Sequence, residues 1–220
     1  MRIFRPLRAI LPPHRDAVCQ WPHIATWQEP GCGDITRKGT LLMTPSTPAA
    51  LPAATRIGHV HLKVADLERA VGFYRDTLGF DVTARYGDQA AFLSAGGYHH
   101  HIGLNTWESK GGSQPAPGST GLYHFAINYP ERRDLAAALK RLYDHGWGID
   151  GASDHGTHEA IYLHDPDGNG IELAWDRDPA LWQRDGKIIM SRQALDFPGL
   201  LAELADPDTD RLLPTLANYT

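Results

Sequence analysis

The apolar and polar positions of the chain follow a regular pattern from residue 57 onward, and this pattern predicts a small α+β unit. An alternating run over 57–64 predicts a strand, and apolar residues at helical spacing over 67–78 predict a helix that ends at Gly79. Three short strand-like runs follow, at 80–86, 90–95 and 99–107. The predicted order is therefore βαβββ.

The same order of elements returns in the second half of the chain. A strand over 122–128 precedes a helix over 135–142 that ends at Gly146, and strand-like runs follow at 147–149, 160–163 and 170–175. The histidine of the opening strand and the glycine after the helix are 20 residues apart in the first unit and 22 in the second. Because one unit cannot bury both of its faces, we expect an α+β fold in which two βαβββ repeats form one curved mixed sheet around a shared metal cavity.

These repeats define one domain over 56–176, with the units at 57–108 and 120–176. The chain after them becomes charged and contains proline, which indicates a C-terminal extension over 177–220. Apolar positions over 194–204 predict one amphipathic helix on the outside of the domain.

The segment before the repeats has a different composition. Residues 1–55 contain eight prolines and show neither the helical nor the strand period, which predicts a disordered leader. The alternative is a start site assigned too early, with Met43 as the natural first residue. Both cysteines, Cys19 and Cys32, lie in this segment, so a metal site further along the chain must use histidine and carboxylate side chains.

Charge and hydropathy exclude several classes of protein. The chain has 220 residues and a net charge of -5, and it contains no run of lysine or arginine, which argues against a nucleic-acid partner. No segment has the eighteen or so consecutive apolar residues that a membrane span needs, and the first twenty residues lack the apolar core of a secretory signal. We expect a soluble cytoplasmic protein that makes no membrane contact.

Histidine is unusually concentrated, because 10 of the 12 histidines lie between His59 and His164. His59 and His124 occupy the same place in the opening strands of the two repeats, which a core role for each does not explain. Glu172 stands between two apolar residues of the last strand, where a carboxylate needs a partner or a cation. Two imidazoles and one carboxylate form a facial triad with three open positions, which suits non-haem Fe(II) and O₂.

The duplication, the two strand-opening histidines and the turn DPDGNGIE at 165–172 resemble the vicinal oxygen chelate (glyoxalase/bleomycin resistance/dioxygenase) superfamily. Within it they are most similar to the type I extradiol ring-cleaving dioxygenases, because Tyr162 precedes Glu172 by the ten residues typical of those enzymes. The resemblance covers Ile57 to about Asp176. His155 precedes Tyr162 by seven residues, slightly closer than the family spacing.

This resemblance implies an Fe(II) ion, or Mn(II), held by His59, His124 and Glu172, with a catechol and O₂ as substrates. It also implies that His155 and Tyr162 hydrogen-bond the substrate oxygen. Small one-domain members of the superfamily often pair, so a homodimer is one expected assembly.

The same resemblance implies an acid-base histidine late in the first repeat, where His99, His100 and His101 are adjacent. Aligning Gly103 and the leucine after it with the small-then-apolar pair of the family favours His100. His99 and His101 remain candidates. The other histidines of the repeats are weaker candidates, for which a structural role is expected rather than a chemical one: His61, His145, His158 and His164.

Two other functions are compatible with this fold. A glyoxalase-like metal-dependent isomerase or lyase needs a fourth protein ligand from the first repeat. Superposing 170–173 on 101–104 puts Gly103 where Glu172 lies, so that ligand is missing unless His101 supplies it. A non-catalytic small-molecule binder of the drug-resistance type would keep the fold without a functional metal.

Overall fold

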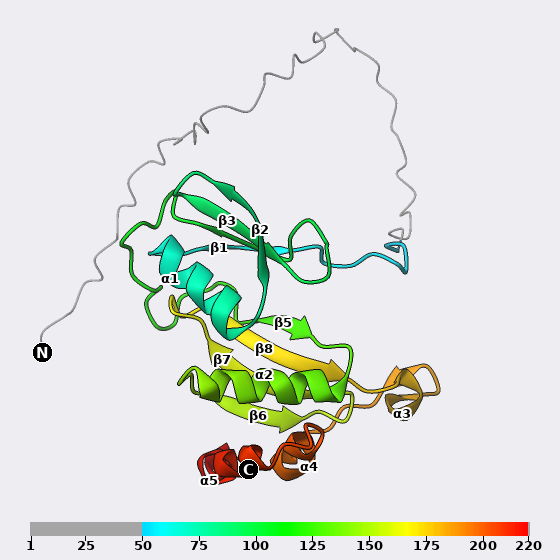
Figure 1. The fold of residues 1–220 in the computed structure, drawn as a ribbon. Coiled ribbons are helices and arrows are strands. Elements are labelled where there is room, and N and C mark those ends of the chain that lie inside the picture. The colour runs from blue at the N-terminus through cyan, green and yellow to red at the C-terminus, as the bar shows by residue number, and fades with distance from the viewer. Residues whose placement is uncertain (1–49, 220) are drawn as a thin grey trace, which may run out of the picture. The chain divides into compact units, whose positions relative to one another are not determined.

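The first repeat folds into the predicted order of elements in the computed structural model, which describes residues 50–219 (Figure 1). Helix α1 continues directly into a short π-helical segment, η1. The strands hydrogen-bond in the order β1-β4-β3-β2, with β1 parallel to β4. The elements are β1 (Val60–Lys63), α1 (Leu67–Gly72), η1 (Phe73–Thr77), β2 (Asp81–Tyr86), β3 (Ala90–Ser94) and β4 (Ile102–Asn105).

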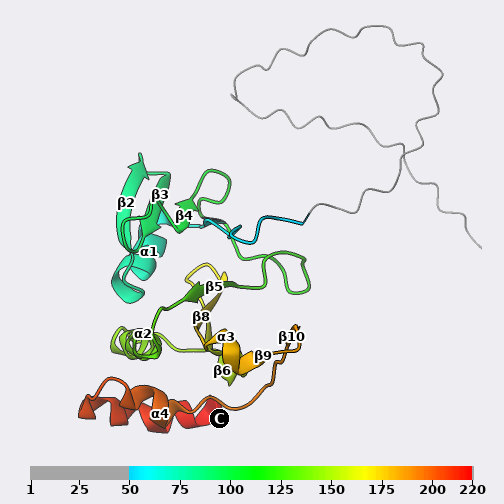
Figure 2. The ribbon, with the colours of Figure 1, turned by 90° about the vertical axis from the view of Figure 1, so that its right-hand side faces the viewer.

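The second repeat has the same topology. Its strands pair in the order β5-β8-β7-β6, with β5 parallel to β8, and Figures 1 and 2 show α2 lying along one face of this sheet. The elements are β5 (Phe125–Asn128), α2 (Arg132–Asp144), β6 (Gly151–Asp154), β7 (His158–His164) and β8 (Gly170–Asp176). The α+β class and the duplication of the βαβββ unit are thus confirmed.

The eight strands form two sheets rather than one. Each repeat builds its own four-stranded sheet, and among the described strands no hydrogen-bonded ladder joins the two. The repeats share instead one apolar core, to which both helices and both sheets contribute buried side chains. The two units are therefore joined by packing, whereas the sequence predicts a single continuous sheet.

The predicted position of one strand is wrong. The run 147–149 predicts the second strand of the second repeat, but β6 begins at Gly151. Trp147 anchors a loop: its indole Nε1 donates to the carbonyl of His164 (3.1 Å), and its ring packs on Phe73 with 4.6 Å between centroids. The apolar side chains before β6 are therefore loop anchors, whereas the strand itself consists of small and polar residues.

Contacts between the repeats converge on the turn that precedes Glu172. The hydroxyl of Tyr74 donates to Asp165 Oδ2 (2.9 Å), and the backbone N–H of Ala65 donates to Asp167 Oδ1 (2.9 Å). Asp165 Oδ1 also accepts the backbone N–H groups of Asp167 and Asn169. The first repeat thus fixes the β7–β8 turn through two carboxylates, buried Asp165 and half-buried Asp167.

We expect Tyr74→Phe to lower the free energy of unfolding by about 1.5–3 kcal/mol, because a hydrogen bond to a buried charged group is lost. Tyr74 is fully buried, and burial raises the pKa of its hydroxyl well above the usual value, so the group remains a donor. Urea denaturation followed by circular dichroism measures the change. Tyr86→Phe is the matched control, since Tyr86 is 68% exposed. Equal stability of Tyr74→Phe and the wild type would contradict the role given to this bond.

The C-terminal extension contains more structure than the single predicted helix. Helix α4 (Phe197–Ala202) lies inside the predicted range, and its residues Phe197, Leu200 and Leu201 are buried in the core. The helices that the sequence does not predict are three to six residues long, which is too short for a periodic pattern to mark them. The other elements are α3 (Pro179–Trp182), β9 (Gln183–Arg184), β10 (Lys187–Ile188), η2 (Pro207–Leu212), α5 (Leu213–Leu216) and η3 (Ala217–Tyr219).

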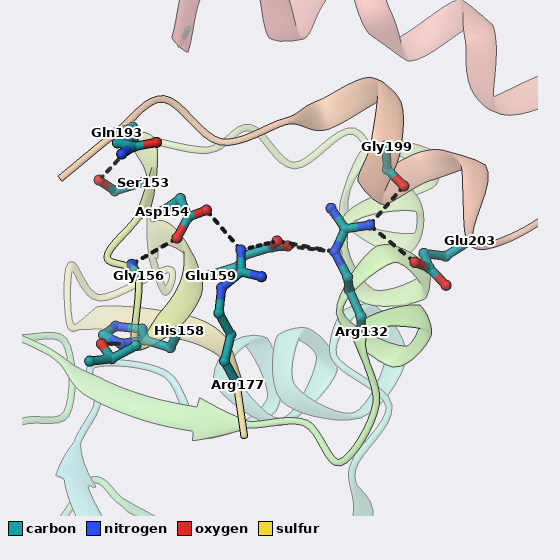
Figure 3. Close-up of polar contacts among 11 residues, drawn as sticks. Arg132, Ser153, Asp154, Gly156, His158, Glu159, Arg177, Gln193, Gly199 and Glu203 are labelled. Carbon is teal, nitrogen blue, oxygen red and sulfur yellow. Dashed lines mark hydrogen bonds and ion pairs between the residues drawn. The ribbon is translucent and has the colours of Figure 1, made fainter. Parts of the chain in front are cut away.

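A buried ion network connects this extension to the second repeat (Figure 3). Glu159 is 3% exposed and accepts hydrogen bonds from Arg132 Nε (2.9 Å) and Arg177 Nη2 (2.8 Å). Arg132 also donates to the carbonyl of Gly199 in α4 (2.8 Å) and pairs with Glu203 (3.1 Å). One carboxylate on β7 therefore links α2, α4 and the segment after β8.

The predicted leader lies almost wholly outside the described residues, because only residues 50–55 of the range 1–55 are described. None of the helices within 50–219 has both the length and the apolar character needed to cross a bilayer.

Candidate functional site

The two faces of the second sheet have different environments. Along β7, Glu159, Ile161 and Leu163 are buried on the side of α2, while His158 and Tyr162 are half-buried on the other side. The side of the sheet away from α2 is called the open face below. All predicted site residues of the second repeat gather at this face or at its edge.

Glu172 is the centre of a hydrogen-bonded group on the open face. Its side chain is buried, with Oε2 3.0 Å from His124 Nε2 and Oε1 3.0 Å from His158 Nε2. The hydroxyl of Tyr162 also donates to Oε1 (3.3 Å). A buried carboxylate that contacts two imidazoles is an arrangement of donors that a divalent transition metal accepts.

Tyr162 and His155, which the family resemblance implies both hydrogen-bond the substrate oxygen, are in direct contact with each other. Their hydroxyl oxygen and Nε2 atom are 2.8 Å apart. Burial, and secondarily the charge of Glu172, raise the pKa of Tyr162 to about 12. The phenol therefore stays protonated at neutral pH and can donate a hydrogen bond.

A cavity of about 480 Å³ opens next to these residues, and its size suits a small aromatic molecule. Its wall combines the residues just before β5, parts of β6 and β7, the start of β8 and the segment after β10. The lining residues that bear on chemistry are Tyr123, His124, Asp150, His155, Tyr162, His164 and Arg192.

The pairing registers show which positions of the two repeats correspond. His61 pairs with Gly103 in the first sheet, and Ala126 pairs with Glu172 in the second. His59 and His124 each lie two residues before the first member of these pairs, so the registers support their equivalence. Gly103 occupies the position that corresponds to Glu172. A Cβ atom at Gly103 would lie 2.9 Å from Cγ of His61, so this position is filled by an imidazole packed over glycine.

His59 lies at the first sheet, next to His100. Their ring centroids are 4.4 Å apart, and His100 also packs on Phe92 at 5.0 Å. Partial burial, and then the neighbouring His59, lower the pKa of His100 below its usual range. The imidazole of His100 is therefore neutral at neutral pH and able to accept a proton.

The structure separates the three adjacent histidines by environment. His101 Nδ1 is 3.0 Å from Ser94 Oγ, and this ring packs on Tyr98 rather than on His59. His99 Nδ1 is 2.8 Å from His100 Nδ1. Of the three, His100 alone has a ring contact with His59 among the described residues, which supports its selection from the sequence.

Two of the three predicted metal ligands, His124 and Glu172, are in contact. His59, the third predicted ligand, packs its ring on His100 at the first sheet. Within residues 50–219, no group of three histidine, cysteine or carboxylate side chains is placed to hold a metal ion. The donor chemistry of His124 and Glu172 fits a metal, and the assignment of His59 as the third ligand remains a prediction.

His158 lies closer to the candidate metal ligands than the sequence suggests, since its Nε2 atom hydrogen-bonds Oε1 of Glu172. The strand register offers a reason. Ala160 of β7 pairs with Ala174 of β8, and this alanine pair lies between His158 and the pair formed by Tyr162 and Glu172. These small side chains leave room for the imidazole to reach the carboxylate. The strand alternation that puts His158 and Tyr162 on one face is the signal that could have identified it.

Paired βαβββ units with an imidazole–carboxylate site define the class of protein. The chain belongs to the glyoxalase/bleomycin resistance protein/dioxygenase superfamily, whose family model matches residues 56–173.

Curated relatives include dioxygenases. The chain is 44% identical over 154 residues to a protein named catechol-2,3-dioxygenase from Bacillus subtilis (strain 168), a match that covers 69% of this chain and 53% of that protein. It is 32% identical over 122 residues to biphenyl-2,3-diol 1,2-dioxygenase 3 from Rhodococcus globerulus, covering 55% and 63%. This chain thus spans between half and two thirds of the length of these relatives.

A similar solved structure is that of lactoylglutathione lyase from Agrobacterium tumefaciens. Its TM-score is 0.46 at 19% sequence identity, and the match covers 56% of this chain and 96% of that chain.

Proposed function

We propose that the protein is an Fe(II)-dependent extradiol dioxygenase that cleaves a catecholic ring next to its vicinal hydroxyls with O₂. The observation that carries this proposal is the contiguous group of His155, Tyr162, Glu172 and His124 beside a cavity of suitable size. The identity to a protein named catechol-2,3-dioxygenase supports it. Family membership alone is compatible with several reactions.

The residues proposed to hold the ion are His59, His124 and Glu172, and Mn(II) suits the same donors as Fe(II). The chemistry that such an ion supplies when bound is chelation of both catechol oxygens and activation of O₂. His158 contacts the carboxylate that would bind the ion, so it orients that ligand and raises its affinity for metal.

Three side chains act on protons and on orientation in this account. Tyr162 donates a hydrogen bond to a substrate oxygen in place of its bond to Glu172, and His155 Nε2 fixes the direction of that hydroxyl. His100, neutral at neutral pH, accepts the proton of a substrate hydroxyl on a ring nitrogen and returns it later in the reaction. A hydrogen-bonded tyrosine–histidine pair suits substrate orientation, and a neutral imidazole suits acid-base catalysis.

We expect Tyr162→Phe to retain metal but to lower kcat by about 100-fold or more, because the hydrogen bond that orients the substrate oxygen is lost. Atomic absorption on desalted protein measures the metal, and oxygen uptake measures turnover. Tyr86→Phe, at an exposed position on β2, is the control. Full activity of Tyr162→Phe would show that this hydroxyl has no part in the reaction.

The glyoxalase-like isomerase or lyase is less well supported by the first sheet. Its fourth ligand would have to stand at the position of Gly103, where the ring of His61 would have to move before a side chain could fit. His101 is turned toward Ser94. Both observations favour a site with three protein ligands.

A further inference from the structure

A segment of the C-terminal extension forms part of the cavity wall. Residues 189–193, called the strap below, pair with the end of β6 through two hydrogen bonds of 2.9 Å between the backbones of Asp154 and Gln193. The N–H of Ser191 donates to the carbonyl of His155 (2.8 Å). The strap is therefore fastened by its backbone to the loop that carries His155.

The buried ion network holds the strap in place. The carboxylate of Asp154 accepts from Arg177 Nη2 (2.7 Å), and the same guanidinium binds Glu159, as Figure 3 shows. Gly156 has a φ of +75°, and a Cβ there would lie 2.7 Å from Ser191 Oγ, so the strap packs closely on this glycine. These contacts fix the backbone on both sides of Arg192.

Arg192 lines the cavity together with His155 and Tyr162. Its charge lies close enough to Tyr162 to offset part of the upward shift of the pKa of that phenol. Within the described part of the chain its guanidinium has no hydrogen-bond or ion-pair partner, in contrast to Arg132 and Arg177. Asp150, the carboxylate among the described lining residues, is already paired with His164 at 2.6 Å.

We propose that Arg192 binds a carboxylate on the substrate, so that the cavity takes a catechol with an acidic side chain. This inference rests on the proposed function, because the ring that carries the carboxylate is assigned there. Arginine matches a carboxylate with two parallel hydrogen bonds. Arg192 is exposed, so beside a neutral catechol its guanidinium stays hydrated, whereas a carboxylate would pair with it.

The test compares acids with their own methyl esters, using the full chain reconstituted with Fe(II). The substrates are 3,4-dihydroxyphenylacetate, 3,4-dihydroxybenzoate and 2,3-dihydroxybenzoate. The wild type should prefer at least one acid over its ester by about tenfold or more in kcat/KM, as a charged hydrogen-bonded pair implies. Arg192→Gln should remove the preference, and Arg192→Lys should restore part of it. Arg184→Gln, an exposed arginine outside the cavity lining, should keep it.

Calorimetric titration of the same acids under nitrogen supplies a readout that needs no turnover. Arg192→Gln should weaken binding of the preferred acid by a similar factor and leave binding of its ester near the wild-type value. If the wild type cleaves catechols but shows no preference for any acid, the role of Arg192 is wrong and the proposed function stands. If nothing is cleaved, the proposed function fails, and the calorimetric titration alone then shows whether Arg192 binds a carboxylate. Equal binding of acids by the wild type and Arg192→Gln would overturn the inference.

Discussion

Glu172→Gln is expected to lose bound metal and activity together. The substitution removes the charge that balances a divalent cation and turns an amide nitrogen toward an imidazole that now contacts a carboxylate oxygen. Altering groups that only support a ligand typically costs 10- to 100-fold in affinity, so loss of the ligand itself should exceed about 100-fold. The metal content of protein passed through a desalting column, measured by mass spectrometry, gives this value directly.

The control for this experiment is Glu108→Gln. Glu108 is an exposed carboxylate paired with Lys63 at 3.7 Å, an interaction worth little at a surface. Circular dichroism should confirm that both variants fold, because Glu172 is buried. Retention of a full equivalent of metal by folded Glu172→Gln would remove Glu172 from the ligand set.

Glu159→Ala should produce the largest loss of stability, about 3–5 kcal/mol in the free energy of unfolding. The substitution leaves Arg132 and Arg177 without the buried carboxylate that they share. Arg132 keeps Glu203 and Arg177 keeps Asp154, so the loss should fall at the lower end of that range. Denaturation in guanidinium chloride measures the difference.

The matched control is Glu203→Ala, which removes a partner of Arg132 whose side chain is 40% exposed. It should cost about 1 kcal/mol or less, as is usual for an exposed pair. A loss below 1 kcal/mol for Glu159→Ala would mean that the network does not hold the C-terminal extension in place.

The duplication could be predicted from the sequence because its signals are local. Apolar side chains at strand and helix spacing mark most elements, and the opening histidines stand at equivalent positions, with which the pairing registers agree. Strand β6 could not be predicted, because Gly151 and its small polar neighbours form a strand only by pairing with β7. The apolar Trp147 before it gives a misleading signal.

Two features of the candidate site depend on how distant parts of the chain pack together. The contact of His158 with Glu172 requires the alanine pair between their rows, and the position of Arg192 requires the bridge between Asp154 and Gln193. The strand alternation of β7 indicates only that His158 shares a face with Tyr162, and no pattern in the sequence indicates the bridge that positions Arg192. His59 illustrates the reverse case, because its equivalence to His124 is visible in the sequence, whereas its distance from Glu172 depends on how the two sheets pack.

Oxygen uptake by the chain reconstituted anaerobically with Fe(II) tests the central claim most directly. The panel consists of catechol, substituted catechols and 2,3-dihydroxybiphenyl, with absorbance followed at the same time. Extradiol cleavage predicts one O₂ consumed per substrate and a yellow ring-opened product. No uptake with any of these compounds, by protein shown to hold iron, would contradict the dioxygenase account and favour an isomerase or lyase of the same superfamily.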